Sequence, residues 1–150
     1  MGNYRQLSQL LVGQWREEGI PLNSGATESE FYALEKALGI SLPEDFRYFY
    51  SLTNGMTDME SDRYFFSLWP LARIYQALEA NETNRVSVSD RKQIAFGDML
   101  IDSYRYLLTF TEQQVYVSTE MVPSEELADS FEEFIQNYLA EPEKLYLTSN

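Results

Sequence analysis

Residues 27–55 read TESEFYALEKALGISLPEDFRYFYSLTNG and contain the signals of two consecutive helices. Thr27 and Glu30 have the spacing of a capping box, in which each side chain satisfies a backbone N–H at the start of a helix. Phe31, Leu34 and Leu38 follow at helical spacing, up to a glycine at position 39 that suits the left-handed residue after a helix. The first half of this stretch therefore predicts an amphipathic helix.

The second half predicts another helix. Ser41-Leu42-Pro43-Glu44 is a start signal, because proline is tolerated in the first turn, where its missing N–H costs nothing. Inward-facing residues of this helix are expected to be Phe46, Phe49 and Tyr50. Its end is expected at Asn54-Gly55, a pair that readily adopts positive φ.

The flanking regions add further elements. On the N-terminal side, four residues at helical spacing predict a helix that ends near Gly19: Tyr4, Leu7, Leu11 and Trp15. On the C-terminal side we expect a strand over 63–69, a helix over 71–78 and a polar surface loop over 81–91.

The last third of the chain predicts strands and a terminal helix. Alternating apolar residues indicate strands over 93–96, 104–110 and 115–117, with a hairpin turn at 111–113. One helical face is expected to hold Leu127, Phe131, Phe134, Ile135, Tyr138 and Leu139. Three acids precede these residues and suit a helix N-terminus, namely Glu125, Glu126 and Asp129. The sequence therefore predicts one α+β domain over residues 1–150, because no linker divides it.

Composition excludes several kinds of chemistry. The 150 residues include 24 acidic and 11 basic side chains, no histidine and no cysteine, and the formal net charge is -13. These numbers exclude disulfides, thiolate nucleophiles, sulfur-ligated zinc and Ser-His pairs. A strongly negative chain is on average repelled by nucleic acid and attracted by a basic partner. We therefore expect a protein partner rather than a nucleic acid.

The sequence predicts no cofactor-binding site, no metal site and no membrane-spanning segment. The acids at 58, 60 and 62 alternate in a loop, but the glycine and the final glutamate of an EF-hand are absent, so a solvated loop is favoured over a calcium site. The first thirty residues lack the apolar core of a signal peptide, and no apolar run approaches the length of a membrane span. We expect a cytoplasmic protein without cofactor or metal.

The C-terminal part is the most acidic region. Residues 112–150 contain nine acids and one base, Lys144. Two interpretations remain open, an ordinary solvated helix face and a docking surface for a cationic protein.

The order of these motifs resembles the SUKH superfamily, the group named for the fungal Smi/Knr cell-wall regulators. The resemblance rests on the spacing from Glu30 to Gly55, followed by Leu68-x-Pro70-Leu71-x-x-Ile74, by 94–98, by the tyrosine-rich strand and by Ser130-Phe131-x-x-Phe134-Ile135. It spans about residues 28–139. The chain departs from common members at 98–102, which replace a glycine-rich polar turn.

The resemblance implies a fold and a role. The fold is α+β, a single domain with a largely antiparallel sheet packed by N-terminal helices and a C-terminal helix. Members have no known catalytic apparatus and bind other proteins. Many bacterial members resemble immunity proteins that neutralise a cognate toxin, often a nuclease, and the fungal members regulate cell-wall glucan synthesis.

Three hypotheses follow for this chain. The first is an immunity protein that covers a basic toxin domain, the second an intracellular regulator or scaffold of cell-wall synthesis, and the third a carboxylate-dependent hydrolase that no motif supports. For the first, the predicted contacts are exposed acids with neighbouring aromatic anchors. They are Asp58, Glu60, Asp62, Tyr64, Asp98, Asp102, Tyr104 and Glu120.

Overall fold

A five-stranded antiparallel sheet lies at the centre of the computed structural model, which describes residues 3–57, 60–80, 92–99, 104–112, 114–119 and 126–142. Neighbouring strands follow the order of the chain: β1 (Phe66–Leu68), β2 (Lys92–Met99), β3 (Tyr104–Phe110), β4 (Val115–Thr119) and β5 (Glu126–Ala128). Each adjacent pair is antiparallel. The predicted α+β fold with an antiparallel sheet is confirmed.

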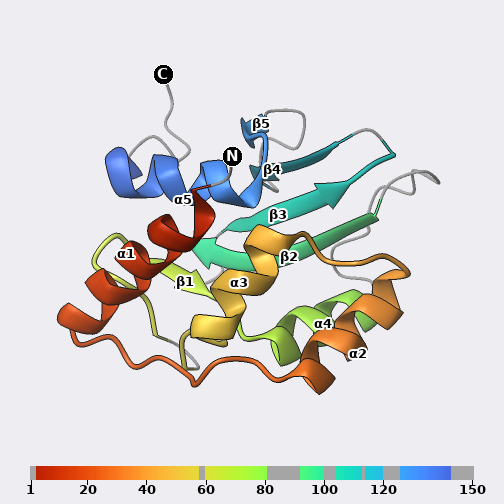
Figure 1. Cartoon of the computed structure of the whole chain (residues 1–150), viewed down its shortest axis with the longest axis horizontal. Coiled ribbons are helices and arrows are strands. Elements are labelled where there is room, and N and C mark those ends of the chain that lie inside the picture. Colours follow the sequence, from red (N-terminus) through yellow and green to blue (C-terminus); the bar gives the residue numbers. More distant parts are fainter. Residues whose placement is uncertain are drawn as a thin grey trace.

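Helices pack on this sheet in two groups (Figure 1). The described helices are α1 (Tyr4–Glu17), α2 (Glu28–Leu38), α3 (Glu44–Leu52), α4 (Leu71–Glu79) and α5 (Phe131–Ala140). One group is α1, α3 and α5, which contact one another over the sheet, and the other is α2 with α4, of which α4 contacts β2. The helices predicted over the N-terminal half are all present.

The capping box of α2 is formed as predicted. The Thr27 side chain accepts a hydrogen bond from the backbone N–H of Glu30, and the Glu30 carboxylate accepts one from the backbone N–H of Thr27 at 2.8 Å. At the other end of the helix, Gly39 has a φ of 77°. Both helix ends are thus encoded locally.

The start of α3 differs in detail from the prediction. Pro43 occupies the N-cap, and Ser41 lies outside the helix. The carboxylate of Asp45 accepts a bond of 2.8 Å from the N–H of Phe46. The start signal therefore works through proline geometry and an acid in the first turn.

Gly55 is required where the chain turns after α3. Its φ is 80°, and a Cβ built there would lie 2.6 Å from the carbonyl carbon of Trp69. Any side chain would collide with that backbone as well as strain its own. The predicted Asn-Gly turn is confirmed, two residues beyond the helix end at Leu52.

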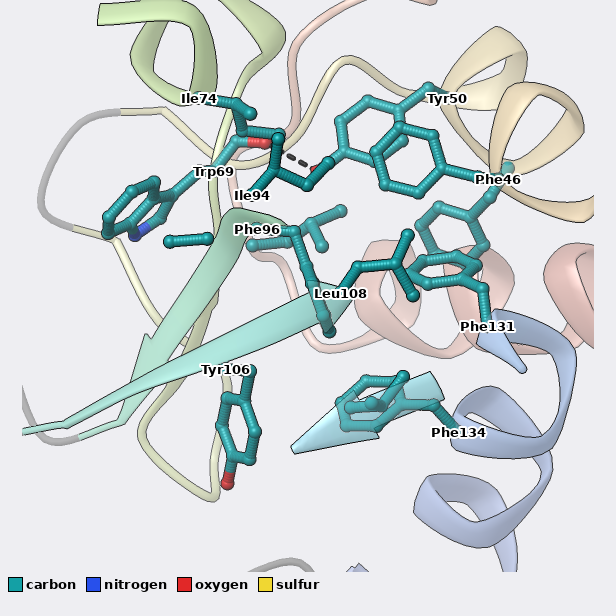
Figure 2. Close-up of a cluster of buried hydrophobic side chains, with 14 of the residues drawn as sticks. Phe46, Tyr50, Trp69, Ile74, Ile94, Phe96, Tyr106, Leu108, Phe131 and Phe134 are labelled. Atoms are coloured by element: carbon teal, nitrogen blue, oxygen red, sulfur yellow. Dashed lines mark hydrogen bonds between the residues drawn. The ribbon is translucent and has the colours of Figure 1, made fainter. Parts of the chain in front are cut away.

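Aromatic side chains build the core between the sheet and the helices (Figure 2). Phe96 of β2 meets Phe131 and Phe134 of α5 at ring-centroid distances of 5.4 and 5.2 Å. Phe46 of α3 meets Phe131 at 5.1 Å, and Tyr106 of β3 meets Phe134 at 5.5 Å. Such pairs contribute about 0.5–1.5 kcal/mol each beyond their buried area. These contacts fix α5 over the centre of the sheet.

Two C-terminal predictions are wrong. Leu127 and Glu126 belong to β5, whose residue Ala128 pairs with Val117 of β4, and not to the terminal helix. That helix begins later, because Ser130 caps it by accepting a hydrogen bond of 3.0 Å from the N–H of Glu133. Leu127 fits the helical spacing by coincidence, since it precedes Phe131 by four residues. Glu125 lies outside the described residues.

The first strand is shorter than predicted. Only Phe66–Leu68 pair with β2, and 63–65 form a tight turn before them. The second strand is longer, extends to Met99 and contains an irregularity between Ala95 and Gly97. The predicted loop over 81–91 lies outside the described residues.

Candidate protein-binding site

The eight predicted contact residues have different positions in the structure. Asp58, Asp102 and Glu120 lie outside the described residues, and the side chain of Tyr104, the first residue of β3, also lies outside them. The remaining four are Glu60, Asp62, Tyr64 and Asp98.

The predicted exposure of Asp62 is wrong. Its residue is only 5% exposed, and its carboxylate accepts four hydrogen bonds. Two come from the indole N–H of Trp15 in α1, at 3.0 Å, and from the hydroxyl of Tyr138 in α5. A buried carboxylate is tolerated because these donors replace the water it has lost. Asp62 therefore ties the loop before β1 to two helices.

The other oxygen of Asp62 shapes the turn that follows. It accepts hydrogen bonds from the backbone N–H groups of Tyr64, at 2.9 Å, and Phe66, at 3.1 Å. The N–H of Asp62 in turn donates to the carbonyl of Phe66 at 2.9 Å, and the N–H of Phe65 donates to the carbonyl of Asp62 at 2.9 Å. One acid thus closes a hairpin whose loop is Arg63, Tyr64 and Phe65.

Tyr64 is the middle residue of this turn and is half-buried. Its ring packs edge-on against Tyr138 with 6.0 Å between centroids, and the guanidinium of Arg63 lies 5.6 Å from its centroid. Arg63 also forms an ion pair with Glu18 at 3.6 Å. Tyr64 therefore belongs partly to the core. Glu60, at the start of the loop, is partly exposed.

The predicted exposure of Asp98 is also wrong. It is 3% exposed and accepts a hydrogen bond of 2.6 Å from the indole N–H of Trp69. Arg73 of α4 approaches the same carboxylate at 3.6 Å and stacks 3.8 Å from the centroid of the Trp69 ring. Arg105, the cross-strand partner of Asp98, lies 5.1 Å from that centroid. The cluster joins α4 to β2 and β3.

Asp62 and Asp98 do not form one site. β1 stands between them, since Asp62 bonds the backbone of Phe66 and Asp98 pairs with Ser67. Asp62 is bound to α1 and α5, whereas the partners of Asp98 include Trp69 and Arg73. Each is a structural carboxylate rather than an exposed contact. Periodicity could not reveal this, because the pattern of apolar and polar residues along the chain does not show whether a tryptophan from elsewhere covers an acid.

A separate acidic surface lies where the N-termini of α3 and α5 meet. Asp45 of α3 accepts a hydrogen bond of 2.9 Å from the backbone N–H of Glu132 in α5. Burial raises the pKa of Asp45 and the Glu132 carboxylate adds to the rise, while hydrogen bonds from the backbone N–H groups of Glu132 and Phe46 partly offset it. Glu44 and Asp129 are exposed next to this contact. The site prediction missed this surface, although the excess of acids after residue 112 pointed to it.

One basic side chain lies near Glu44, since Arg5 and Glu44 both interact with the Tyr4 side chain, but the C-terminal part of this surface has no base of its own. Residues 112–142 contain no Lys or Arg. Elsewhere Arg47 pairs with Glu28 and Glu35 at 3.1 and 3.0 Å, and Lys92 donates to the carbonyl of Leu38 at the end of α2. These two basic side chains are thus engaged within the fold.

The chain matches the family model described as SMI1 / KNR4 family (SUKH-1) over residues 25–137. The chain belongs to this family. No curated protein sequence matches it. Membership supports a protein-binding role of the immunity or regulator type, and the SMI1 / KNR4 family is generally non-enzymatic.

The SMI1 / KNR4 match begins after α1 and ends within α5. Trp15 thus lies outside the matched region while its partner Asp62 lies inside it. The N-terminal helix is therefore joined to the family domain by a buried hydrogen bond as well as by apolar packing.

The described residues offer neither a membrane span nor a cluster of metal ligands. None of their helices is long and apolar enough to cross a membrane. The same residues contain no group of three or more histidine, cysteine, aspartate or glutamate side chains placed to hold a metal ion.

Proposed function

We propose that this chain is a cytoplasmic immunity protein that binds and covers a cognate toxin domain, a basic and nuclease-like one. The observation that carries the proposal is the acidic surface at the N-termini of α3 and α5, in a family of protein-binding domains. The chain blocks its target by steric cover and charge and performs no catalysis.

Charge complementarity supports a basic partner. A nuclease must attract phosphate, so its active-site surface is positive. Because this chain has a net charge of -13, electrostatic attraction accelerates its encounter with such a surface. In this chain, the exposed residues Glu44 and Asp129 lie on the acidic surface at the N-termini of α3 and α5. Complementary charge of this kind also suppresses wrong partners.

Three of the basic side chains are paired within the fold. Arg47, Arg63 and Arg73 each face a carboxylate of the same chain. The charges of these three bases are therefore offset locally, and the net charge of the whole chain is -13.

The predicted contact residues divide into two roles under this proposal. Glu60 and Tyr64 are partly exposed and remain candidate contacts, as do Asp58, Asp102, Tyr104 and Glu120. Asp62 and Asp98, both buried, position their surroundings instead.

Affinity capture from a lysate of the source organism tests the proposal. The chain serves as bait, bound proteins are washed with rising salt, and each fraction is analysed by mass spectrometry. We expect one basic toxin-like domain that is released as salt screens the charges. The recovered domain, expressed in a host cell, should be toxic alone and harmless when this chain is co-expressed.

The same experiment distinguishes the regulator hypothesis. Recovery of envelope-synthesis proteins, or of no specific protein, contradicts the immunity role and favours an intracellular regulator of cell-wall synthesis. Binding that is insensitive to salt contradicts the electrostatic mechanism.

A further inference from the structure

Phe65 combines an exposed aromatic side chain with a left-handed backbone conformation. Its side chain is 56% exposed, and its backbone φ is 68°. Among the described residues it alone has a positive φ without being glycine. A bulky residue in this region of φ/ψ space is a genuine outlier.

The geometry of the turn explains why glycine would suit this position better. Asp62 and Phe66 close a hairpin through the 2.9 Å bond from Asp62 N–H to the Phe66 carbonyl. The loop has three residues, and the 2.9 Å bond from Phe65 N–H to the Asp62 carbonyl closes a four-residue turn within it. Three-residue hairpin loops commonly end in a left-handed residue, and glycine is preferred there.

The surrounding structure holds Phe65 in this conformation. Asp62 accepts hydrogen bonds from the N–H groups on both sides of it, those of Tyr64 and Phe66. Trp15 and Tyr138 fix the Asp62 carboxylate in turn. The ring is therefore presented from a rigid turn. Strain that neighbouring contacts over-determine is characteristic of binding sites.

We propose that Phe65 is the apolar anchor by which this chain docks on its basic partner protein. This inference rests on the proposed function and adds the position of the contact. Aromatic side chains on rigid supports often dominate interface energy, because they bury a large area and lose little freedom. The partner should offer an apolar pocket with a rim of Lys and Arg.

The charges near the turn fit such a rim. Glu60 precedes the hairpin and is partly exposed, and Glu18, the residue after α1, faces the turn. Arg63 of the turn is paired with Glu18 at 3.6 Å, so its charge is largely offset. A basic rim around the pocket would thus meet acids rather than an unopposed cation.

The turn and the acidic surface lie near opposite ends of α5. The turn contacts α5 through Tyr64 and Tyr138, near its C-terminal end, while Asp129 lies just before its N-terminal end. Ten helical residues span about 15 Å. A partner that buries about 800 Å² on each side can cover both.

Phe65→Gly tests the proposal, with Tyr32→Ala as its matched control. Tyr32 of α2 is 64% exposed, so both variants remove an exposed aromatic ring. The probe is the purified basic domain that salt releases from the wild-type bait, and its dissociation constant is measured by calorimetry for all three proteins. Urea unfolding of each free protein is recorded in parallel.

We expect Phe65→Gly to weaken binding at least tenfold while its urea midpoint stays the same or rises, and Tyr32→Ala to bind as wild type does. A lower urea midpoint for Phe65→Gly would mean that Phe65 stabilises the folded protein, and this would overturn the proposal. Equal binding by Phe65→Gly and wild type would overturn the anchor while leaving the proposed function intact. If the wild-type chain captures no basic domain, the proposed function is contradicted, and the proposed role of Phe65 is contradicted with it.

Discussion

The indole N–H of Trp15 donates a hydrogen bond of 3.0 Å to the carboxylate of Asp62, which lies 47 residues later in the chain. Tyr138 donates to the same oxygen, so one buried acid connects α1, the loop before β1 and α5. Because each helix uses the same acceptor, loss of that acceptor affects both helices at once.

Asp62→Ala should therefore lower the free energy of unfolding by about 3 kcal/mol, because it removes the acceptor of three buried donors, those of Trp15, Phe66 and Tyr138. Urea denaturation followed by tryptophan fluorescence measures this loss. The control is Glu60→Ala in the same loop, which should stay within about 0.5 kcal/mol of wild type. Equal effects of the two substitutions would mean that the Asp62 contacts contribute little.

Asp98→Leu should destabilise the protein by about 2 kcal/mol, since it leaves the buried indole N–H of Trp69 without this acceptor. It also removes the partner of Arg73. Asp98→Asn retains an oxygen acceptor and should cost less. The two variants can be compared by urea unfolding, and a larger loss for the asparagine variant would contradict this account.

Gly55→Ala and Gly19→Ala separate a steric clash from backbone strain. The φ values are nearly the same, 80° and 78°, but a Cβ at Gly55 meets the Trp69 backbone at 2.6 Å while nothing lies within 4 Å of one at Gly19. We expect a cost of about 1 kcal/mol at Gly19, from strain alone. The cost at Gly55 should be larger by about 2 kcal/mol, in the range of overpacked sites. Thermal unfolding of both variants measures the difference, and equal costs would remove the clash from the explanation.

Asp45 should make stability depend on pH in a defined direction. Burial raises its pKa above the ordinary value of 3.8, so the folded protein binds this proton more tightly than the unfolded chain does. Its contribution to stability is therefore fully present below the ordinary value and is lost as pH rises through the folded pKa. The stability of wild type relative to Asp45→Asn should fall as pH rises from 3.8 toward neutrality. Urea unfolding at a series of pH values measures this, and a relative stability that rises with pH would contradict it.

Local sequence signals predicted most of the helices correctly. Thr27, Glu30 and Gly39 act within a few residues of chain, so their roles can be recognised before any tertiary contact is known. β5 was missed because three residues are too short for a periodic signal, and Leu127 matched the spacing of the helix that follows.

The candidate site was harder to predict than the fold. Whether Asp62 and Asp98 face solvent depends on Trp15 and Trp69, which lie 47 and 29 residues away from them in the chain. Phe65 carries no sequence signal, since its significance lies in a left-handed φ that only the turn geometry reveals. Net charge gave the sign of the surface but not its position.

Asp129→Lys should slow association with the basic partner several-fold and reduce the dependence of the rate on salt. Asp129 is exposed beside the N-termini of α5 and α3, where the proposed partner approaches. Rim charges act mainly on the association rate, so the dissociation rate should change little. Surface plasmon resonance with the domain recovered by capture measures both rates. Glu79→Lys is the matched control, because it makes the same change in net charge on an exposed residue at the end of α4. A Glu79→Lys effect as large as that of Asp129→Lys would mean that total charge alone governs the encounter, or that the partner approaches α4 instead.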